Sequence, residues 1–200
     1  GTLVRNSNMA EAYAWLLTEE GLVLRYLEAC TEQIVASLLA AKGAELADPI
    51  VFMTYALEML IPPWFGETLF DEFVFPYDQQ VNATIHRHGG RHRAHCHGRC
   101  FDFLERFVAM GIDATEPLEH PPAGNTDLAD AKRTVGDRMM LSGNVRSEMF
   151  HRMTPDEVLS EVKAALKAAP GGGFTLATSG AGTDDNDPDE NMPRVIDNCV

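Results

Sequence analysis

The amino-acid sequence predicts an α/β protein built on a parallel sheet, and three observations carry this prediction. Stretches with strand character alternate with stretches of helical periodicity five times from residue 48 onward, which is typical of parallel strands joined by helices. Hydrophobic residues make up 45% of the 200 residues, enough to bury one sizeable core. No low-complexity segment or short repeat interrupts the alternation.

The expected elements follow one another along the chain without long gaps. The helices are expected over residues 9–20, 22–43, 67–90, 99–111, 126–136 and 154–169, with a further helix beginning near Pro188. The strands are expected over residues 48–60, 91–96, 112–118, 138–145 and 172–178.

Local signals mark the ends of several elements. The second helix has apolar residues at helical spacing and is expected to stop at Gly43. Pro76 is expected either to kink the helix that contains it or to divide it in two. Thr154 is expected to cap the last long helix, with Pro155 at its first position. The apolar run 48–60 is expected to be a buried strand that leads into a loop.

The number of strands suggests a larger architecture. A closed (β/α)8 TIM barrel usually takes about 250 residues, so this chain is expected to supply about five of the eight strand–helix units. An open fragment would leave two parallel edges exposed, and we therefore favour missing units upstream in a longer protein. The predicted organisation is a helical segment over 1–44 and the C-terminal part of a barrel over 45–200.

Composition narrows the class of partner. The formal net charge is −14, from 30 acids against 16 bases, which argues against nucleic acid or an anionic membrane as a partner. Residues 86–99 nevertheless carry four arginines and no acid, and a local basic pocket suits a small anionic ligand. The four cysteines are too scattered for a disulfide scaffold, and no signal peptide or apolar run of membrane length is present. We expect a cytoplasmic protein.

The densest group of reactive side chains is the stretch "IHRHGGRHRAHCHGRC". Five of the seven histidines lie between His86 and His97, together with Arg87, Arg91 and Arg93. This stretch is either a metal site, an anion-binding patch or an ordinary basic loop. The arginines are able to hold a carboxylate or phosphate by bidentate pairing.

Alternation along the strand 91–96 separates these side chains. Residues at i and i+2 point to the same face, so His95 and His97 are able to share a ligand, and the alternative is hydrogen bonding to backbone. Cys96 is expected to point into the helix layer as a small buried hydrophobe. Cys100 is expected at the start of the next helix, where the helix dipole would lower its pKa.

Several stretches resemble one known superfamily in their order and spacing. They are "FDEFVFPYDQQVNATIHRHGG", "AHCHG", "MGIDATEPLEHPPAGNTDLADAKRTVGDRMMLSGNV", "TPDEVLSEVKAAL" and "GGGFTLATS". Over roughly residues 45–192 the chain resembles the uroporphyrinogen decarboxylase (URO-D) superfamily, which includes the cobalamin-dependent methyltransferases. The resemblance implies a (β/α)8 barrel with its active site at the carboxyl ends of the strands.

The methyltransferase branch implies a metal site. Its His-x-Cys-Gly motif, which binds zinc with a later Cys and in some states a Glu, is similar to His95-Cys96-His97-Gly98, and the Glu is matched by Glu119. One thiolate position is thus His97, and the later Cys has no counterpart in the turn after "GGGFTLAT". The remaining set of His95, His97 and Glu119 is expected to hold zinc or iron(II) with open positions.

Other site residues are expected, Asn144 from the resemblance and the rest from their own chemistry and their places in the predicted elements. Asn144 matches a family pocket residue and is expected to be catalytic together with Glu58, which follows the first strand and is either a general acid–base or a loop charge. Arg93 and Tyr77 are expected to bind substrate. The Asp-Ser-Trp and Asp-Pro motifs of the true decarboxylase are absent from "VFMTYALE" and "GNVRSEM".

Three functions follow from these observations. The first is methyl transfer, metal-dependent and linked to a corrinoid partner protein, on a tetrapyrrole-linked or methoxylated small molecule. The second is metal-free decarboxylation of a porphyrinogen or another polycarboxylate, with Arg93 binding an acid group. The third is a non-catalytic binding or assembly domain, which would form a tight homodimer.

Overall fold

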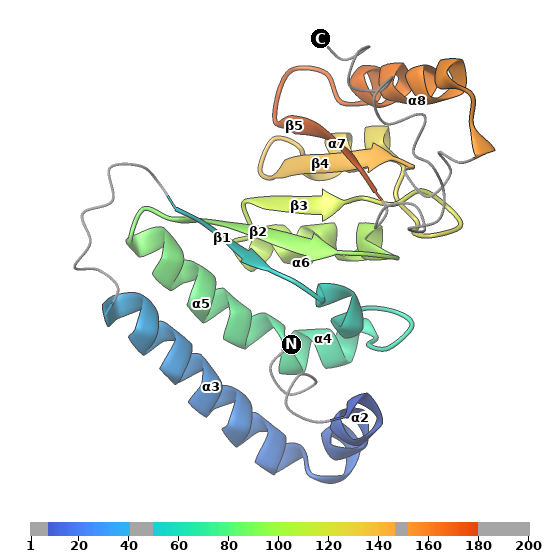
Figure 1. The fold of residues 1–200 in the computed structure, drawn as a ribbon. Coiled ribbons are helices and arrows are strands. Elements are labelled where there is room, and N and C mark those ends of the chain that lie inside the picture. The colour runs from blue at the N-terminus through green and yellow to red at the C-terminus, as the bar shows by residue number, and fades with distance from the viewer. Residues whose placement is uncertain (1–7, 41–49, 147–151, 180–200) are drawn as a thin grey trace. The chain divides into compact units, whose positions relative to one another are not determined.

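A computed structural model describes residues 8–40, 50–146 and 152–179. Its five strands are parallel, follow the order β1-β2-β3-β4-β5 and alternate with helices (Figure 1). The prediction of an α/β fold that forms part of a (β/α)8 barrel is therefore confirmed. The predicted helix end at Gly43 and the helix near Pro188 lie outside the described residues.

The chain divides into two compact units, residues 1–94 with 106–113 and residues 95–105 with 114–200. The elements in the first part of the chain are α2 (Met9–Thr18), α3 (Glu20–Ala40), β1 (Val51–Thr54), the 3-10 helix η2 (Leu57–Leu60), α4 (Glu67–Phe73), α5 (Phe75–Arg87) and β2 (Arg91–Cys96). Those in the second part are η3 (Cys100–Phe103), α6 (Leu104–Ala109), β3 (Ala114–Pro117), α7 (Leu128–Val135), β4 (Met140–Val145), α8 (Pro155–Ala168) and β5 (Phe174–Thr178).

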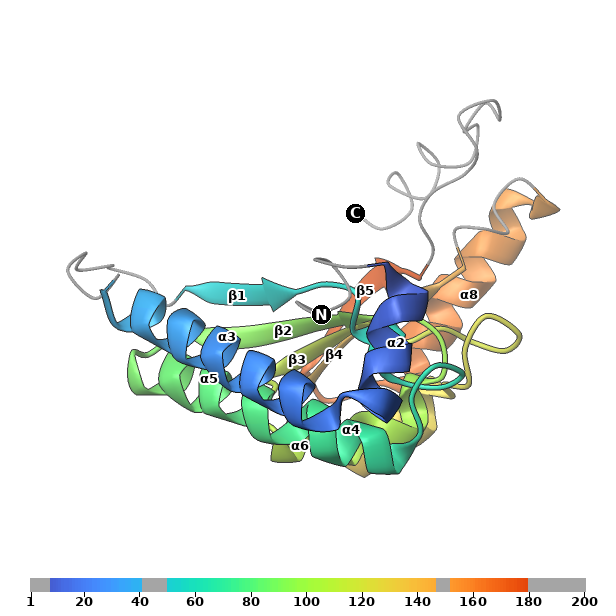
Figure 2. The ribbon, with the colours of Figure 1, turned by 90° about the horizontal axis from the view of Figure 1, so that it is seen from below.

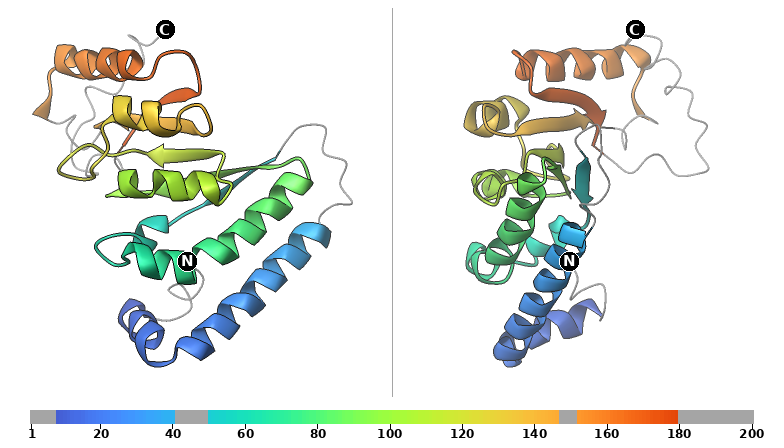
Figure 3. Two further views of the ribbon diagram at one scale, coloured as in Figure 1. Left: turned by 180° about the vertical axis from the view of Figure 1, so that it is seen from behind. Right: turned by 90° about the vertical axis from the view of Figure 1, so that its left-hand side faces the viewer.

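In the first unit, the helices pack as a layer beside β1 and β2. Figures 1 and 3 show α5 between α3 and these two strands, and in Figure 2 both helices lie below β1. The predicted helix over 67–90 is divided at Val74, and Pro76 lies in the first turn of α5. In the first turn of a helix the backbone nitrogen donates no intrahelical hydrogen bond, so proline is tolerated there. The helix therefore ends before Pro76 and a new one begins, in place of one kinked helix.

The prediction of a buried strand over 48–60 is wrong in extent and burial. The strand covers only Val51–Thr54, and Val51 is 59% exposed. Within the part of the chain that the structure describes, β1 lies at the edge of the sheet and pairs only with β2. The apolar residues that follow it, Leu57 and Leu60, are buried from a 3-10 turn instead.

The buried His92 of β2 has a role in the first unit. Its Nε2 lies 3.0 Å from the Thr54 hydroxyl, and its backbone N–H donates to Asp113 at 2.7 Å. The same Asp113 carboxylate pairs with His86 at 2.7 Å. Burial lowers the pKa of His92 to about 4, although the Asp113 charge opposes this shift.

This lowered pKa predicts acid sensitivity. The folded pKa of about 4 lies below the ordinary 6.5, so between these values the unfolded state binds a proton that the folded state does not. The free energy of unfolding is therefore expected to fall by up to about 3 kcal/mol as the pH drops from 6.5 to 4. Denaturant titrations across this range should show that His92→Gln reduces the pH slope, whereas His88→Gln, at an exposed position, leaves it unchanged. An unaltered slope in His92→Gln would rule out this assignment.

The second unit gathers around β4, β5 and α8. Val145 of β4 packs with Val158 and Val162 of α8, and Figure 3 shows this helix beside β4 and β5. Thr154 and Glu157 form a capping box at the start of α8, which confirms the predicted N-cap and the proline at the first position. No helix in the described part of the chain is long and apolar enough to cross a membrane.

Candidate functional site

Two histidines lie side by side at the carboxyl end of β2. Residues of this strand alternate between a buried and a more accessible face, so that Cys96 is fully buried, as expected, while His95 remains partly accessible. His97 follows directly after the strand. The ring centroids of His95 and His97 are 4.6 Å apart, with the rings nearly perpendicular. The predicted shared face of the two imidazoles is therefore present.

Each of the two imidazoles is paired with a carboxylate. His97 Nδ1 lies 2.9 Å from Glu119 Oε1, and His95 Nδ1 lies 3.1 Å from Glu116 Oε1. The four side chains are between 11% and 32% exposed, so water screens these pairs only in part. When such an imidazole is neutral, a carboxylate at Nδ1 favours the tautomer that carries its proton there and leaves the lone pair on Nε2.

Glu116 is a site residue that the sequence prediction missed. It lies on β3, at the accessible position between buried Thr115 and Pro117. The alternation of β3 would have placed its side chain on the accessible face of the sheet. Only the pairing of β3 with its neighbour decides that it meets His95.

Glu119 is held on both of its oxygens. In addition to His97, it accepts the backbone N–H of Gly98 through Oε2 at 2.6 Å. Gly98 has φ +80°, which a glycine adopts without strain. At Gly124, a Cβ atom would lie 2.5 Å from the carbonyl oxygens of both Gly98 and Glu119. Only glycine allows the loop that carries Glu119 to approach the end of β2 this closely.

The side chains of this site meet only part of what a metal ion needs. Among residues 8–40, 50–146 and 152–179, no three His, Cys, Asp or Glu side chains form a preassembled ion site. The predicted ligands His95, His97 and Glu119 therefore do not form a ready-made set of three in the described part of the chain, and Glu119 contacts His97 and the Gly98 N–H instead. Two imidazole ligands do fit, since a metal-binding His commonly donates its other ring N–H to a carboxylate.

The thiol of Cys100, close to this site, is not activated as a nucleophile. Cys100 is fully buried, and burial raises its pKa to about 11, although a contact with the Thr126 hydroxyl works in the opposite direction. The expectation that a helix dipole lowers the pKa of Cys100 is therefore wrong. The residue begins the short 3-10 helix η3, and desolvation outweighs any dipole there.

The other predicted site residues lie in different surroundings. Asn144, at the end of β4, is 1% exposed and donates from Nδ2 to the Leu118 carbonyl at 3.2 Å. Glu58 lies in η2 with a buried Oε2 that has no hydrogen-bond partner among the described residues. Tyr77 of α5 lines an apolar groove with residues of α2 and α3, and burial raises its pKa. Arg93 is half-buried on β2.

The parallel sheet with alternating helices is of the (β/α)-barrel type, and the imidazole–carboxylate pairs lie at a strand's carboxyl end, where such barrels have their active sites. The family model "Uroporphyrinogen decarboxylase (URO-D)" matches residues 2–199, and the chain belongs to this family.

Solved structures show the same fold. Among 18 matching chains is a methyltransferase from Methanosarcina mazei, which is 20% identical with a TM-score of 0.68. The similarity covers 94% of this chain and 52% of that one, so the chain spans about half the length of that methyltransferase. No curated protein matches the sequence.

Proposed function

We propose that this chain is part of a URO-D family enzyme that transfers a methyl group to or from a small molecule, with a divalent metal ion and a corrinoid partner protein. The observation that supports this proposal most is the pair of adjacent imidazoles, His95 and His97, each backed by a carboxylate. Zinc or iron(II) at this place would act as a Lewis acid that activates a thiol acceptor.

The chain's own residues have positioning roles in this proposal. Glu116 and Glu119 accept the Nδ1 protons and thereby orient both Nε2 atoms, which are the donors that would bind the ion. The Gly98 N–H holds Glu119 in place. When bound, a corrinoid would supply the methyl group and keep the electron pair of the bond that is broken. The acceptor thiol would bond to this methyl group and lose its proton to water, and His95 and His97 would hold the ion that activates the thiol.

A second function remains open because the same pairs suit acid–base chemistry. A carboxylate at Nδ1 stabilises the imidazolium that forms when Nε2 takes up a proton, and this imidazolium is able to donate that proton. In decarboxylation of a polycarboxylate, the bond to the carboxyl carbon breaks, carbon dioxide leaves, and a proton from such an imidazole replaces it. This reaction needs no metal ion.

One experiment separates the two reactions. The protein, loaded with zinc or iron(II), is incubated with methylcobalamin and 2-mercaptoethanol, and in parallel with uroporphyrinogen. We expect loss of the methylcobalamin absorbance, dependence on the added metal and no carbon dioxide release. His88→Ala, an exposed control, should behave as the wild type. Carbon dioxide release without metal would overturn methyl transfer. Neither product, together with a tight dimer in sedimentation, would favour the assembly domain.

A further inference from the structure

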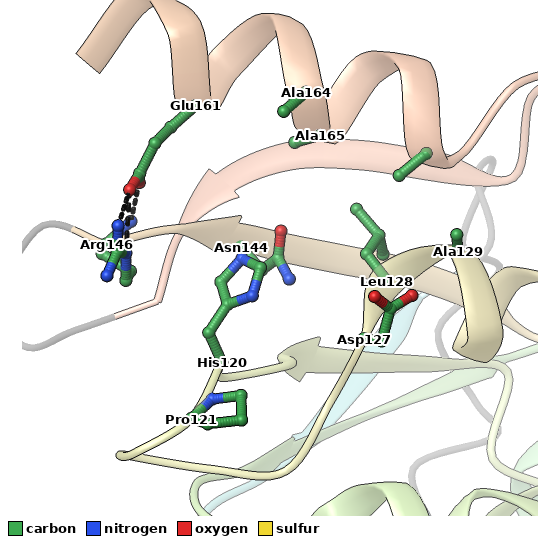
Figure 4. Close-up of a pocket in the computed structure, with 11 residues that line it drawn as sticks. His120, Pro121, Asp127, Leu128, Ala129, Asn144, Arg146, Glu161, Ala164 and Ala165 are labelled. Carbon is green, nitrogen blue, oxygen red and sulfur yellow. Dashed lines mark hydrogen bonds and ion pairs between the residues drawn. The ribbon is translucent and has the colours of Figure 1, made fainter. Parts of the chain in front are cut away.

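A cavity of about 420 Å³ lies in the second unit, away from the two histidines. Figure 4 shows its walls, which come from the loop after β3, the start of α7, the end of β4 and one face of α8. Its volume is in the range of small-molecule sites. Neither His95 nor His97 lines it, so it is not part of the candidate metal site.

One wall of the cavity is apolar and made of small side chains. Ala164, Ala165 and Ala168 face it from α8, and Leu128 faces it from α7. Because alanines project little from a helix, they leave a shallow surface against which a flat group is able to pack. The cavity therefore favours a planar ligand.

The opposite wall presents hydrogen-bond acceptors beside the imidazole of His120. Asn144 uses its Nδ2 to donate to the Leu118 carbonyl, which turns its Oδ1 toward the cavity, and Figure 4 shows this oxygen directed toward α8. Asp127 caps α7 by accepting the Asp130 N–H through Oδ1. Its second oxygen remains available to a ligand N–H.

The charges of the lining leave a carboxylate without an opposite charge. Arg146 is bound through Nε and Nη2 to Glu161 Oε1, and its backbone N–H donates to the same side chain. These two charges offset each other. Asp127 is the lining charge that has no ion pair in the described part of the chain. The positive end of the α7 helix dipole offsets the charge of Asp127 in part. A ligand at this carboxylate is therefore held by N–H hydrogen bonds as well as by its positive charge.

We propose that this cavity binds a planar organic cation with N–H donors, of the amidinium class. The flat body would pack against the alanines of α8, and the N–H groups would donate to Asp127 and Asn144. A carboxylate or phosphate ligand would meet Asp127 and is disfavoured. The cavity includes Asn144, which the family resemblance places in the substrate pocket, but binding of the cation needs no metal ion and is tested without methyl transfer.

Three probes of nearly equal size test the proposal by calorimetry on the full chain: benzamidine, benzamide and benzoate. Benzamidine is expected to bind about tenfold more tightly than benzamide, the difference made by one charge-assisted hydrogen bond, and benzoate is expected not to bind. Asp127→Asn retains a good helix cap but should bring benzamidine down to the affinity of benzamide. Ala164→Leu, at an exposed position of α8, should block both ligands by filling the cavity.

Asp137→Asn is the matched control, because Asp137 is exposed and does not line the cavity. It should leave benzamidine binding unchanged. The proposal is overturned if benzoate binds as tightly as benzamidine, or if benzamidine binding survives Ala164→Leu. The proposal is also overturned if benzamidine does not bind at concentrations up to about 10 mM. A dissociation constant above this value corresponds to a binding free energy weaker than about 3 kcal/mol.

Discussion

His97→Ala is expected to lower the affinity of the protein for zinc by more than about 100-fold, since loss of an outer hydrogen-bond partner alone typically costs 10- to 100-fold. The substitution removes one of the two candidate imidazole ligands and leaves Glu119 with only the Gly98 N–H as a partner. Competition with a chromophoric chelator measures the affinity. Elemental analysis of the purified wild type should show near-stoichiometric metal.

Variants of Glu116 distinguish an outer partner from a direct ligand. Glu116→Ala is expected to weaken zinc binding by about 10- to 100-fold, because His95 would lose the carboxylate at its Nδ1. Glu116→Gln should retain most of the affinity, since its amide oxygen still accepts that proton. His88→Ala is the control, at an exposed histidine. Equal losses in Glu116→Gln and Glu116→Ala would show that the carboxylate binds the ion directly.

The absence of metal would be decisive. If neither wild type nor variants bind zinc or iron after incubation, the histidines serve as hydrogen-bonding groups in a pocket, and the metal-dependent function is excluded. The proposed binding of an amidinium ligand to the cavity does not depend on this result.

Gly124→Ala is expected to destabilise the protein by about 2–3 kcal/mol, a typical cost of overpacking. The added Cβ would lie 2.5 Å from two carbonyl oxygens and 2.9 Å from Glu119 Cβ, and none of these is a flexible chain end. The loop must therefore move away from the end of β2, and this movement would separate Glu119 from His97. Thermal unfolding should show a midpoint lower by roughly 4–12 °C.

Gly21→Ala is the matched control for this substitution. Gly21 lies within α3, where an added Cβ would approach nothing closer than 3.8 Å. Alanine is the better helix former, so this variant should be as stable as the wild type or more so. A Gly124→Ala protein with the wild-type melting temperature and metal affinity would show that the loop adapts without disturbing the site.

Elements that depend on local chemistry could be predicted from the amino-acid sequence. The strand 91–96 and the cap at Thr154 agree with the structure because they rest on alternation and on hydrogen bonds within a few residues. The shared face of His95 and His97 follows from the same alternation. The extent of β1 was mispredicted because its burial depends on neighbours that the local pattern does not contain.

Which carboxylate meets which histidine could not be predicted, because it depends on how distant segments pack. Glu116 and Glu119 are 21 and 22 residues from their partners, and their pairing depends on how β3 and the loop after it lie against the end of β2. The same holds for the pKa of Cys100, which desolvation in the core raises, and for Gly124, whose need for glycine arises from a carbonyl oxygen of Gly98. Local propensity carries no information on such contacts, since they form only when distant segments pack together.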